Sequence, residues 1–481
     1  MMRRRNFLLN SLAAVSLAAS TSPRLHAESA EGRRVTLVPA DQSLFRVRVE
    51  MDLKGNIHLS RNELVSKDRD RQVPIDYNSV IDFEERVFGD NGQGLTGARR
   101  YYHEARSEGK TAGTPQRIEL RDSARHVATH MGQGRSVTYA TRAYLTHEEL
   151  DLLEIPVNSL AVDGMLPADA IAVDETYAVP AEAVGRLLDI DAVQDSEIEG
   201  KLTSLDNKTA RLEFKGNVQG SVAGVPTMID LAGKISFDLD SRTCTWVAMA
   251  IRERREIGKA EPGFEIAATI KMIRKPLSTA AAVSEQPLAE APPEGQLLVN
   301  LYSIPGRYGV LMDRQWQMIR QSTSLSRLRM VENDRDIAQC DVRHLPPLKP
   351  GEQLTAEALQ ADVRRSLGDQ FDEFLQVSEQ VNSSDLRVVR LHAIGAVQRV
   401  PVQWVFAHCS DDNGRRILAT FTMAAENVEA FAGADEQFVH SLRFLDLDTA
   451  AEADSPETPQ AAAEPEQQTA ALNAPQTTSS R

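Results

Sequence analysis

The stretch TMIDLAGKISFDLDSRTCTWVA, residues 227–248, alternates apolar and polar residues on both sides of a short polar turn. One face is expected to carry Thr227, Ile229, Leu231, Ile235, Phe237 and Leu239 and, after the turn at 240–242, Cys244, Trp246 and Ala248. Period-two patterning joined by short polar turns is typical of antiparallel strands with one buried face. This stretch therefore predicts an antiparallel sheet.

The same alternation appears on both sides of this stretch. Apolar residues recur at every second position in 45–53, 210–214 and 264–270. Only 146–153 and 180–188 have the pattern of helices. Residues 36–275 are therefore predicted to form a β-rich, antiparallel domain, shaped as a cupped sheet or an open barrel.

A second region, residues 297–446, mixes strand and helix patterns. Strands are expected at 327–331, 337–345, 388–394, 400–409 and 416–423. Thr355 is a good N-cap for a helix whose apolar stripe contains Leu359, Val363, Leu367 and Phe371, and a last helix is expected at 435–442. An antiparallel sheet covered by helices, an α+β sandwich, is the predicted architecture.

Two segments have the composition of connectors. Residues 276–296 are rich in Ala, Pro and Glu and have no apolar period, so we expect a linker with few contacts that could couple the two domains. Residues 447–481 are acidic and contain no aromatic residue. Such a segment buries too little apolar surface to offset the entropy of ordering, and we expect a disordered tail.

The N-terminal residues 1–27 combine basic residues, an apolar run and a small residue at Ala27, which is typical of a signal peptide. Arg4 and Arg5 are followed by Asn-Phe-Leu, as in twin-arginine leaders, whose proteins cross the membrane already folded. An ordinary secretory leader and an uncleaved anchor remain alternatives. We therefore expect export to the periplasm or the cell exterior and no transmembrane segment in the mature chain.

Charge and cysteine content exclude several classes of protein. The net charge is −15, and removal of residues 1–27, which hold four arginines and no acids, would leave −19. Nucleic-acid binders usually carry a basic surface, so we expect no nucleic-acid partner. The three cysteines have no Cys-x-x-Cys spacing. Cys340 and Cys409 are expected in neighbouring strands, either bonded to each other or free.

Two resemblances extend this interpretation. The order of elements in 297–446, with VPVQWVFAH (400–408) and ADEQFVHSLRF (434–444), resembles PsbP-like α/β/α sandwich domains. That family is known mainly for binding and assembly modules, so the resemblance implies no catalytic residues. The first region, with LTHEELDLLEIPVNSLAVDGMLP (145–167), is similar to a family of large secreted bacterial proteins of unknown function.

Two motifs suggest chemistry but lack the context that such chemistry needs. GQGLTG (92–97) matches Gly-x-Gly-x-x-Gly, yet the preceding VIDFEERVF (80–88) is amphipathic, unlike the buried parallel strand before a dinucleotide loop. We expect a turn. His126 and His130 have a spacing that suits two metal ligands on a helix. The flanking pattern favours a strand or loop, and we expect surface histidines and no metal.

Residues 86–142 contain ten basic and five acidic residues, a local excess of five positive charges. One interpretation is a patch for an anionic ligand, such as lipid head groups or an acidic polymer. Its residues would be Arg99, Arg100, Arg106, Arg117, Arg121 and Arg125. The other interpretation is a solvated sheet face paired with acids elsewhere in the chain.

These observations predict an exported, non-enzymatic binding or scaffold protein of the cell envelope. The β-rich domain would present its cupped sheet to an apolar or amphipathic ligand, and the α+β domain would contact another envelope protein. The alternative is a hydrolase or other envelope enzyme whose site is assembled from loops without a linear motif. A twin-arginine-exported cofactor protein is a third possibility. No catalytic, cofactor-binding or metal-binding residues are predicted.

Overall fold

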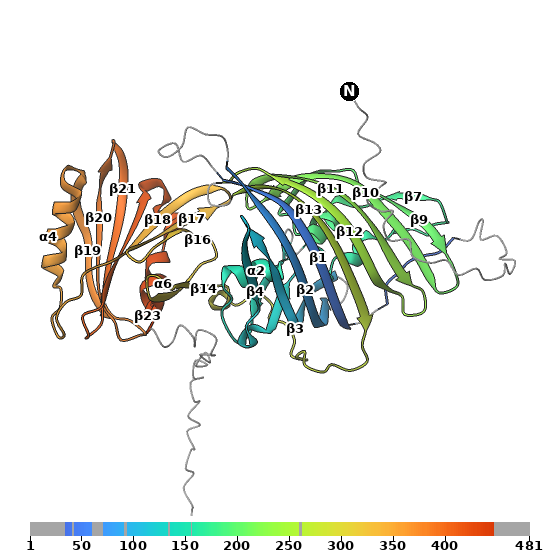
Figure 1. The fold of residues 1–481 in the computed structure, drawn as a ribbon, viewed down its shortest axis with the longest axis horizontal. Helices are drawn as coiled ribbons and strands as arrows, with labels where there is room; N and C mark the ends of the chain where they lie inside the picture. The colour runs from blue at the N-terminus through green and yellow to red at the C-terminus, as the bar shows by residue number, and fades with distance from the viewer. Residues whose placement is uncertain are drawn as a thin grey trace, which may run out of the picture.

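The computed structural model describes residues 34–40, 43–59, 71–90, 94–132, 135–154, 156–258 and 262–446. Strands dominate it and form antiparallel sheets of thirteen, seven and three strands (Figure 1). The prediction of a mainly antiparallel β protein is confirmed.

The predicted leader, 1–27, and the predicted tail, 447–481, lie outside the described residues. Within the described ranges, no helix combines the length and the apolar character that crossing a membrane requires.

The thirteen-stranded sheet is open, because its path runs from β6 at one edge to β7 at the other. Its order is β6-β5-β3-β2-β1-β13-β12-β11-β10-β9-β7, with β4 beside β3 and β8 beside β10. The strands are β1 (Leu44–Leu59), β2 (Arg71–Asp90), β3 (Gly94–Thr111), β4 (Thr114–Glu119), β5 (His126–His130), β6 (Val137–Ala140), β7 (Thr176–Ala178), β8 (Ala192–Ser196), β9 (Glu199–Leu205), β10 (Thr209–Val222), β11 (Val225–Asp238), β12 (Thr243–Arg255) and β13 (Gly263–Pro276).

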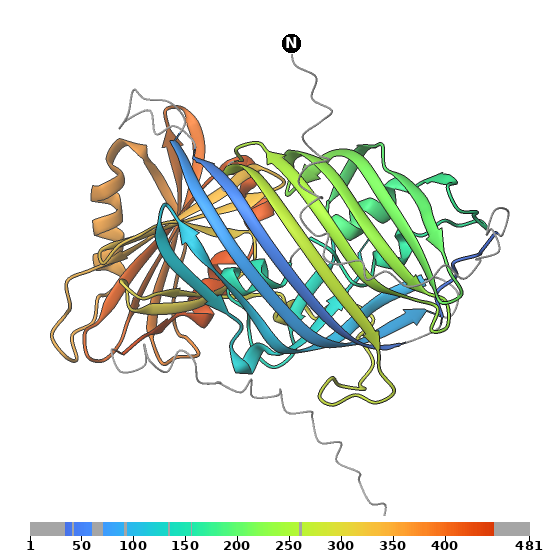
Figure 2. The same ribbon diagram turned by 45° about the vertical axis from the view of Figure 1, so that its right-hand side comes forward.

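The sheet curves around the segments that connect β3 to β9 (Figure 2). These segments include α2 (His147–Leu153), α3 (Ala181–Leu188), and the short helices η1 (Asp122–Ala124) and η2 (Val162–Met165). Thr146 caps α2 in a capping box with Glu149, at the start of the helix that was expected at 146–153. Apolar residues of α2 and α3 share one core with the inner face of the sheet.

Within the stretch 227–248, Trp246 and Ala248 were expected on the buried face of the sheet, and this expectation is wrong. Residues of β11 are buried as expected, but β12 buries Cys244, Val247 and Met249, leaving Trp246 half-buried on the other face. The pairing of β11 with β12 shifts where Trp246 lies opposite Ser236 and Cys244 lies opposite Phe237. This β-bulge inserts one residue and reverses the alternation beyond it.

The GQGLTG loop connects two antiparallel strands, since β2 ends at Asp90 and β3 begins at Gly94. A dinucleotide loop opens a helix, whereas here a paired strand follows. The last four residues of the motif thus belong to β3, whereas residues 91–93 lie outside the described ranges, and the turn stays a prediction. Gly97 has φ of 154° and approaches β5 so closely that a Cβ atom would overlap the carbonyl oxygen of Thr129. Close approach, and not a ligand, explains this glycine.

The seven-stranded sheet has the order β16-β17-β18-β22-β21-β20-β19, and the three-stranded sheet has the order β14-β15-β23. The strands are β14 (Val299–Ser303), β15 (Tyr308–Met312), β16 (Trp316–Gln321), β17 (Leu325–Glu332), β18 (Arg335–His344), β19 (Phe371–Val381), β20 (Arg387–Val397), β21 (Val400–Ser410), β22 (Arg416–Ala424) and β23 (Arg443–Phe444). The helical elements are η3 (Glu294–Gln296), α4 (Ala356–Leu367), η4 (Gly368–Gln370), η5 (Ala425–Asn427), α5 (Val428–Phe431) and α6 (Ala434–Ser441).

Each face of the seven-stranded sheet has its own core. Leu359 and Val363 of α4 pack on one face with Trp404 and Phe406. The three-stranded sheet, α5 and α6 cover the opposite face, where Phe438 and other apolar residues are buried.

Cys340 and Cys409 were predicted to lie in neighbouring strands, and this prediction is wrong. Cys340 lies on β18 and Cys409 on β21, and β22 runs between these strands. Both cysteines are buried and free. Sequence spacing could not reveal this order, because the last strand of a meander can insert between earlier ones.

The predicted linker, 276–296, makes specific contacts with the large sheet. The carboxylate of Glu84 on β2 accepts hydrogen bonds from the backbone N–H groups of Ala281, Ala282 and Val283, at 3.0, 2.9 and 3.1 Å. Arg99 adds hydrogen bonds to the carbonyl oxygens of residues 286 and 287. Although burial favours the neutral acid, these backbone donors and His103 lower the pKa of Glu84 to about 2. The segment is fixed to the sheet by hydrogen bonds.

Glu84→Gln is expected to lower the free energy of unfolding by about 1–2 kcal/mol, because charge-assisted hydrogen bonds become neutral ones. Urea titration measures this change, and proteolysis at 281–288 should become faster. The matched control is Glu285→Gln, since Glu285 is 84% exposed in its ion pair with Arg86. That variant should unfold like the wild type. Equal stability of all three proteins would contradict the role of Glu84.

Candidate functional site

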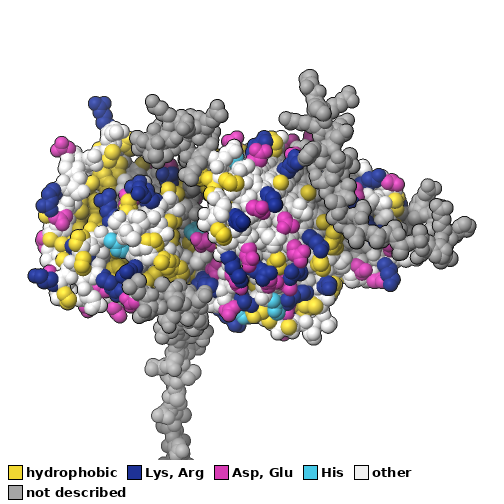
Figure 3. All heavy atoms as spheres, viewed as in Figure 1, with side chains coloured by type: hydrophobic (Ala, Val, Ile, Leu, Met, Phe, Trp, Pro, Cys, Tyr) yellow, Lys and Arg dark blue, Asp and Glu magenta, His cyan; other side chains and the backbone are white. Residues whose placement is uncertain are grey.

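The six arginines of the predicted anionic-ligand patch are divided between surface and interior. Arg100 is buried and Arg121 half-buried, whereas Arg117 is exposed. Their ion pairs are Arg100 with Glu85, Arg106 with Glu104, Arg117 with Glu108 and Glu119, Arg121 with Glu149 and Arg125 with Asp122, and Arg99 binds backbone carbonyl groups. Charged side chains of both signs are interspersed over β1, β2 and β3 (Figure 3). These residues do not form a single cationic surface.

His126 and His130 both lie on β5, as the flanking pattern predicted. His126 packs against Tyr101 and His130 against Tyr139. Burial, together with nearby arginines, lowers the pKa of both rings. His130 is buried, which corrects the expected surface position. Across the described ranges, no group of three or more His, Cys, Asp or Glu side chains is placed to hold a metal.

The concave side of the large sheet encloses a small polar site. The Arg100 Nε lies 2.9 Å from Glu85 Oε1, and the Ser159 hydroxyl donates to the same oxygen at 2.7 Å. The adjoining cavity measures about 30 Å³. A water needs roughly 10–15 Å³ on this measure, so the cavity has room for water and not for an apolar ligand.

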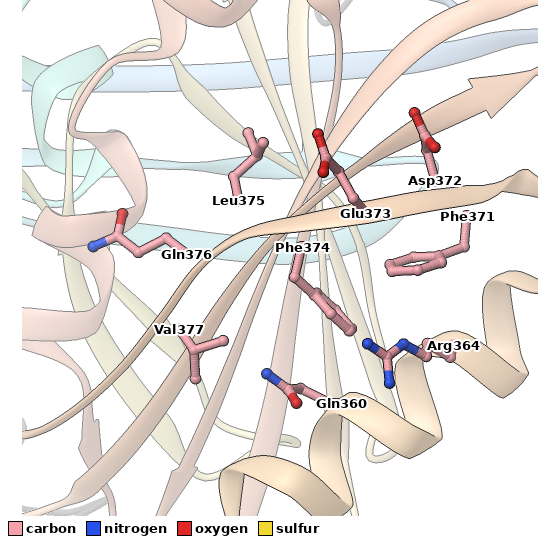
Figure 4. Close-up of a pocket in the computed structure, with 9 residues that line it drawn as sticks. All are labelled: Gln360, Arg364, Phe371, Asp372, Glu373, Phe374, Leu375, Gln376 and Val377. Atoms are coloured by element: carbon pink, nitrogen blue, oxygen red, sulfur yellow. The ribbon is translucent and has the colours of Figure 1, made fainter.

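The larger hollow lies between α4 and β19 and has a volume of about 440 Å³. Phe371 and Phe374 point from β19 toward α4, where Gln360 and Arg364 face them (Figure 4). The guanidinium of Arg364 lies 5.0 Å from the ring centre of Phe374, which is a cation–π contact. We call this hollow, with the open side of β19, the β19 groove.

Strand β19 is a long, open edge of the seven-stranded sheet. It has eleven residues, β20 is its only partner among the described strands, and none of its side chains is buried. The edge strands β6, β7 and β16 have only four, three and six residues. Natural proteins usually keep free edges short or covered, because unpaired backbone groups attract another strand.

Apolar side chains line this edge. Leu375, Val377 and Val381 are 54%, 41% and 66% exposed. Val400, at the end of the neighbouring hairpin, is 52% exposed. Figure 3 shows hydrophobic side chains gathered over the part of the molecule that contains the seven-stranded sheet. The edge therefore combines unpaired backbone with exposed apolar surface.

The two halves of β19 differ. Register shifts between Phe371 and Glu373 and between Phe374 and Gln376 mark bulges, whereas 376–381 pairs with β20 without interruption. The N–H of Asn382 donates to the carbonyl oxygen of Leu386. Since hydrogen-bonded and non-hydrogen-bonded pairs alternate, the backbone groups of residues 377, 379 and 381 are directed away from β20.

The sequence predicted α4 but missed β19. Phe371 was expected in the helix, yet the helix ends at Leu367 and Gly368 follows with φ of 53°. A glycine just after the last helical residue is a common stop signal and could have marked this end. The bulges remove the alternation by which the strand would have been recognised.

No protein-family model and no curated protein matches the chain. Among solved structures, lipovitellin is similar over 52% of this chain and 27% of its own, with 8% identity and a TM-score of 0.28. The translocator domain of autotransporter NalP from Neisseria meningitidis is similar over 80% and 88%, with 6% identity and a TM-score of 0.10. A mutant porin of Rhodopseudomonas blastica is similar over 79% and 99%, with 7% identity and a TM-score of 0.11. These scores indicate neither a shared fold nor a shared function.

Proposed function

We propose that this chain is an exported, non-enzymatic binding or scaffold protein of the cell envelope and that it binds a partner protein at the β19 groove. The observation that carries the proposal is the eleven-residue edge strand β19, which no other described strand pairs on one side and which has no buried side chain. An extended segment of a partner would add to the sheet as an eighth strand.

The energetics of strand addition fit this edge. Main-chain hydrogen bonds to residues 377, 379 and 381 would supply affinity, and pockets for alternate side chains would supply specificity. Val377 and Val381 offer apolar surface, which stabilises a complex by about 25 cal/mol for each Å² removed from water. The rigid partner strand β20 holds the acceptor strand in place, so its ordering costs little on binding.

The concave face of the large sheet is a weaker candidate for a ligand site. Helices α2 and α3 occupy it and share its core, and its cavity has room for water only. We therefore place binding on the seven-stranded sheet and assign the large sheet a scaffold role.

We also propose two domains, 36–275 and 297–446, the second with a PsbP-like architecture. The large sheet and the seven-stranded sheet have their own cores, although Val299 of the second domain packs in the core of the first, and this supports the division. The segment fixed by Glu84 and a bond from Asn300 N–H to the Leu145 carbonyl oxygen would keep the two domains together.

Export is testable through Arg4 and Arg5. If the twin-arginine machinery recognises this leader, Arg4→Lys with Arg5→Lys should leave the precursor in the cytoplasm. Cell fractionation and immunoblotting measure the result. Normal export of the double variant would favour the ordinary secretory route.

The β19 groove is testable without a known partner. Random twelve-residue peptides displayed on phage are selected on the purified chain, and the enriched peptides are synthesised. Val377→Pro should weaken their binding by at least about tenfold, because proline removes an outward-directed N–H and blocks the added strand. Fluorescence anisotropy measures the affinity.

Val377→Thr is the matched control, since it keeps the N–H and a β-branched side chain and should bind almost normally. Thermal unfolding of both variants verifies that the fold is intact. Failure to enrich any peptide, or equal binding by Val377→Pro and the wild type, would overturn the proposal.

A further inference from the structure

We infer that the occupant of the β19 groove is a cationic extended segment of another protein. This inference rests on the proposed function and adds the chemical class of the partner. Its basis is the distribution of charge along the free edge, together with the poor fit of the two other candidate occupants, a second copy and the chain's own tail.

The charged side chains of β19 are all acidic. The strand contains Asp372, Glu373 and Glu379 and no lysine or arginine. Asp372 and Glu373 are exposed and make no ion pair with the described residues, whereas Glu379 pairs with Arg387 at 2.8 Å. Edge strands often carry lysine, which discourages pairing, so an acidic edge selects its partner by charge.

The carboxylates and the apolar groups are placed for two kinds of contact. Leu375 and Glu373 point away from α4, while Phe374 and Val377 point toward it (Figure 4). Arg364 is stacked on the two phenylalanine rings, so its charge lies on the α4 side. A strand that alternates β-branched and cationic residues would place apolar groups toward α4 and cations toward Asp372 and Glu373.

A second copy of this chain complements the edge poorly. If two copies of β19 paired antiparallel with Gln376 at the centre, each Glu373 would lie opposite Glu379 of the other copy. Like charges directly opposite each other destabilise a strand pair. Such a seam would contain six carboxylates and no basic residue of either strand.

The chain's own tail is no better as an occupant. Residues 448–481 contain six acids and a single basic residue, Arg481. Asp and Glu would meet the acidic edge, and the prolines of the tail have no N–H for a ladder. A basic segment of a different protein is the occupant that the charges favour.

Two synthetic peptides test the inference, (Lys-Val-Thr-Val)3 and (Glu-Val-Thr-Val)3, each with a fluorophore at its N-terminus. At 50 mM salt the lysine peptide should bind the full chain at least about tenfold more tightly than the glutamate peptide. The difference should shrink as salt is raised toward 1 M, where the Debye length falls to about 3 Å.

The charge-reversal variant Asp372→Lys with Glu373→Lys is the decisive comparison, because it changes the formal charge of β19 from −3 to +1. Both positions are exposed, so the variant should melt like the wild type. Its preference should reverse, with the glutamate peptide binding more tightly.

The outcomes separate the two proposals. Equal binding of both peptides, or an unchanged preference in the charge-reversal variant, would overturn the cationic partner and leave the groove proposal standing. Absence of binding by either peptide and by any phage-selected peptide would overturn the groove itself. A wild-type dimer in sedimentation that Val377→Pro converts to a monomer would make a second copy the occupant and overturn the inference.

Discussion

Glu85→Ala is expected to lower the free energy of unfolding by about 3–5 kcal/mol, the largest effect that we predict. Glu85 is fully buried on β2, and the side chain of Arg100 beside it is 8% exposed. Alanine would leave the guanidinium of Arg100 buried with the neutral partners Asn158, Ser159 and Tyr102. Urea-induced unfolding measures the loss.

The double variant Glu85→Leu with Arg100→Met is the matched control. Removing both charges also removes the desolvation cost of burying them, so the double variant should be close to the wild type in stability. Leu and Met are near in volume to the side chains they replace. If the double variant lost as much stability as Glu85→Ala, the effect would arise from packing and not from the unpaired charge.

Period-two patterning predicted much of the large sheet. Alternation in 45–53 and 227–237 is confirmed as strand, and Thr355, the predicted N-cap, marks the start of α4. These features are local, because the residues that decide them lie within a turn or a strand of one another. Sequence patterns over a few residues are therefore sufficient to predict these strands and helix starts.

The sequence analysis missed the features that a single inserted residue or a distant contact decides. The bulge in the pairing of β11 with β12 moved Trp246 to the other face, and the two bulges of β19 concealed that strand. Glu84 fixes the segment 281–283, although these residues are nearly 200 positions away along the chain. Neither a bulge nor a distant hydrogen bond leaves a periodic signal in the sequence.

The candidate site could not be found from sequence for a related reason. The prediction looked for residues that carry chemistry and selected six arginines, whereas the β19 groove depends on an edge that no strand in the described ranges covers. Whether a strand lies at an edge is a property of the whole sheet order. The acids of β19 and its exposed valines acquire significance only when that order is known.

The second large effect is expected at His408, as a loss of stability in acid. Its ring is fully buried on β21, and neither ring nitrogen has a hydrogen-bond partner among the described residues. Burial, with further contributions from the charges of Arg416 and Arg387, lowers the pKa of His408 to about 4. An unfolded histidine has a pKa of about 6.5, so the unfolded state takes up the proton first.

Because the pKa of His408 is lower in the folded state than in the unfolded state, the protein loses stability as the pH falls. The stabilisation from neutral His408 is complete above about pH 6.5 and is lost as the pH falls toward 4, by about 2–3 kcal/mol between pH 7 and pH 4.5. Other groups also titrate in this range, because burial lowers the pKa of His126, His130 and His392 as well. Urea titrations of the wild type and of His408→Leu at both pH values isolate the contribution of one ring.

His408→Leu should lose about 2–3 kcal/mol less than the wild type over this pH interval, since leucine takes up no proton. The control is His440→Leu, because His440 lies exposed on α6 and its replacement leaves the buried ring unchanged. That variant should follow the wild type at both pH values. If His408→Leu lost as much stability in acid as the wild type, then the unpartnered ring of His408 would not be a source of acid sensitivity. The loss would then arise from the other buried histidines or from the carboxylates, of which Glu84, with its pKa of about 2, would contribute below about pH 4.5.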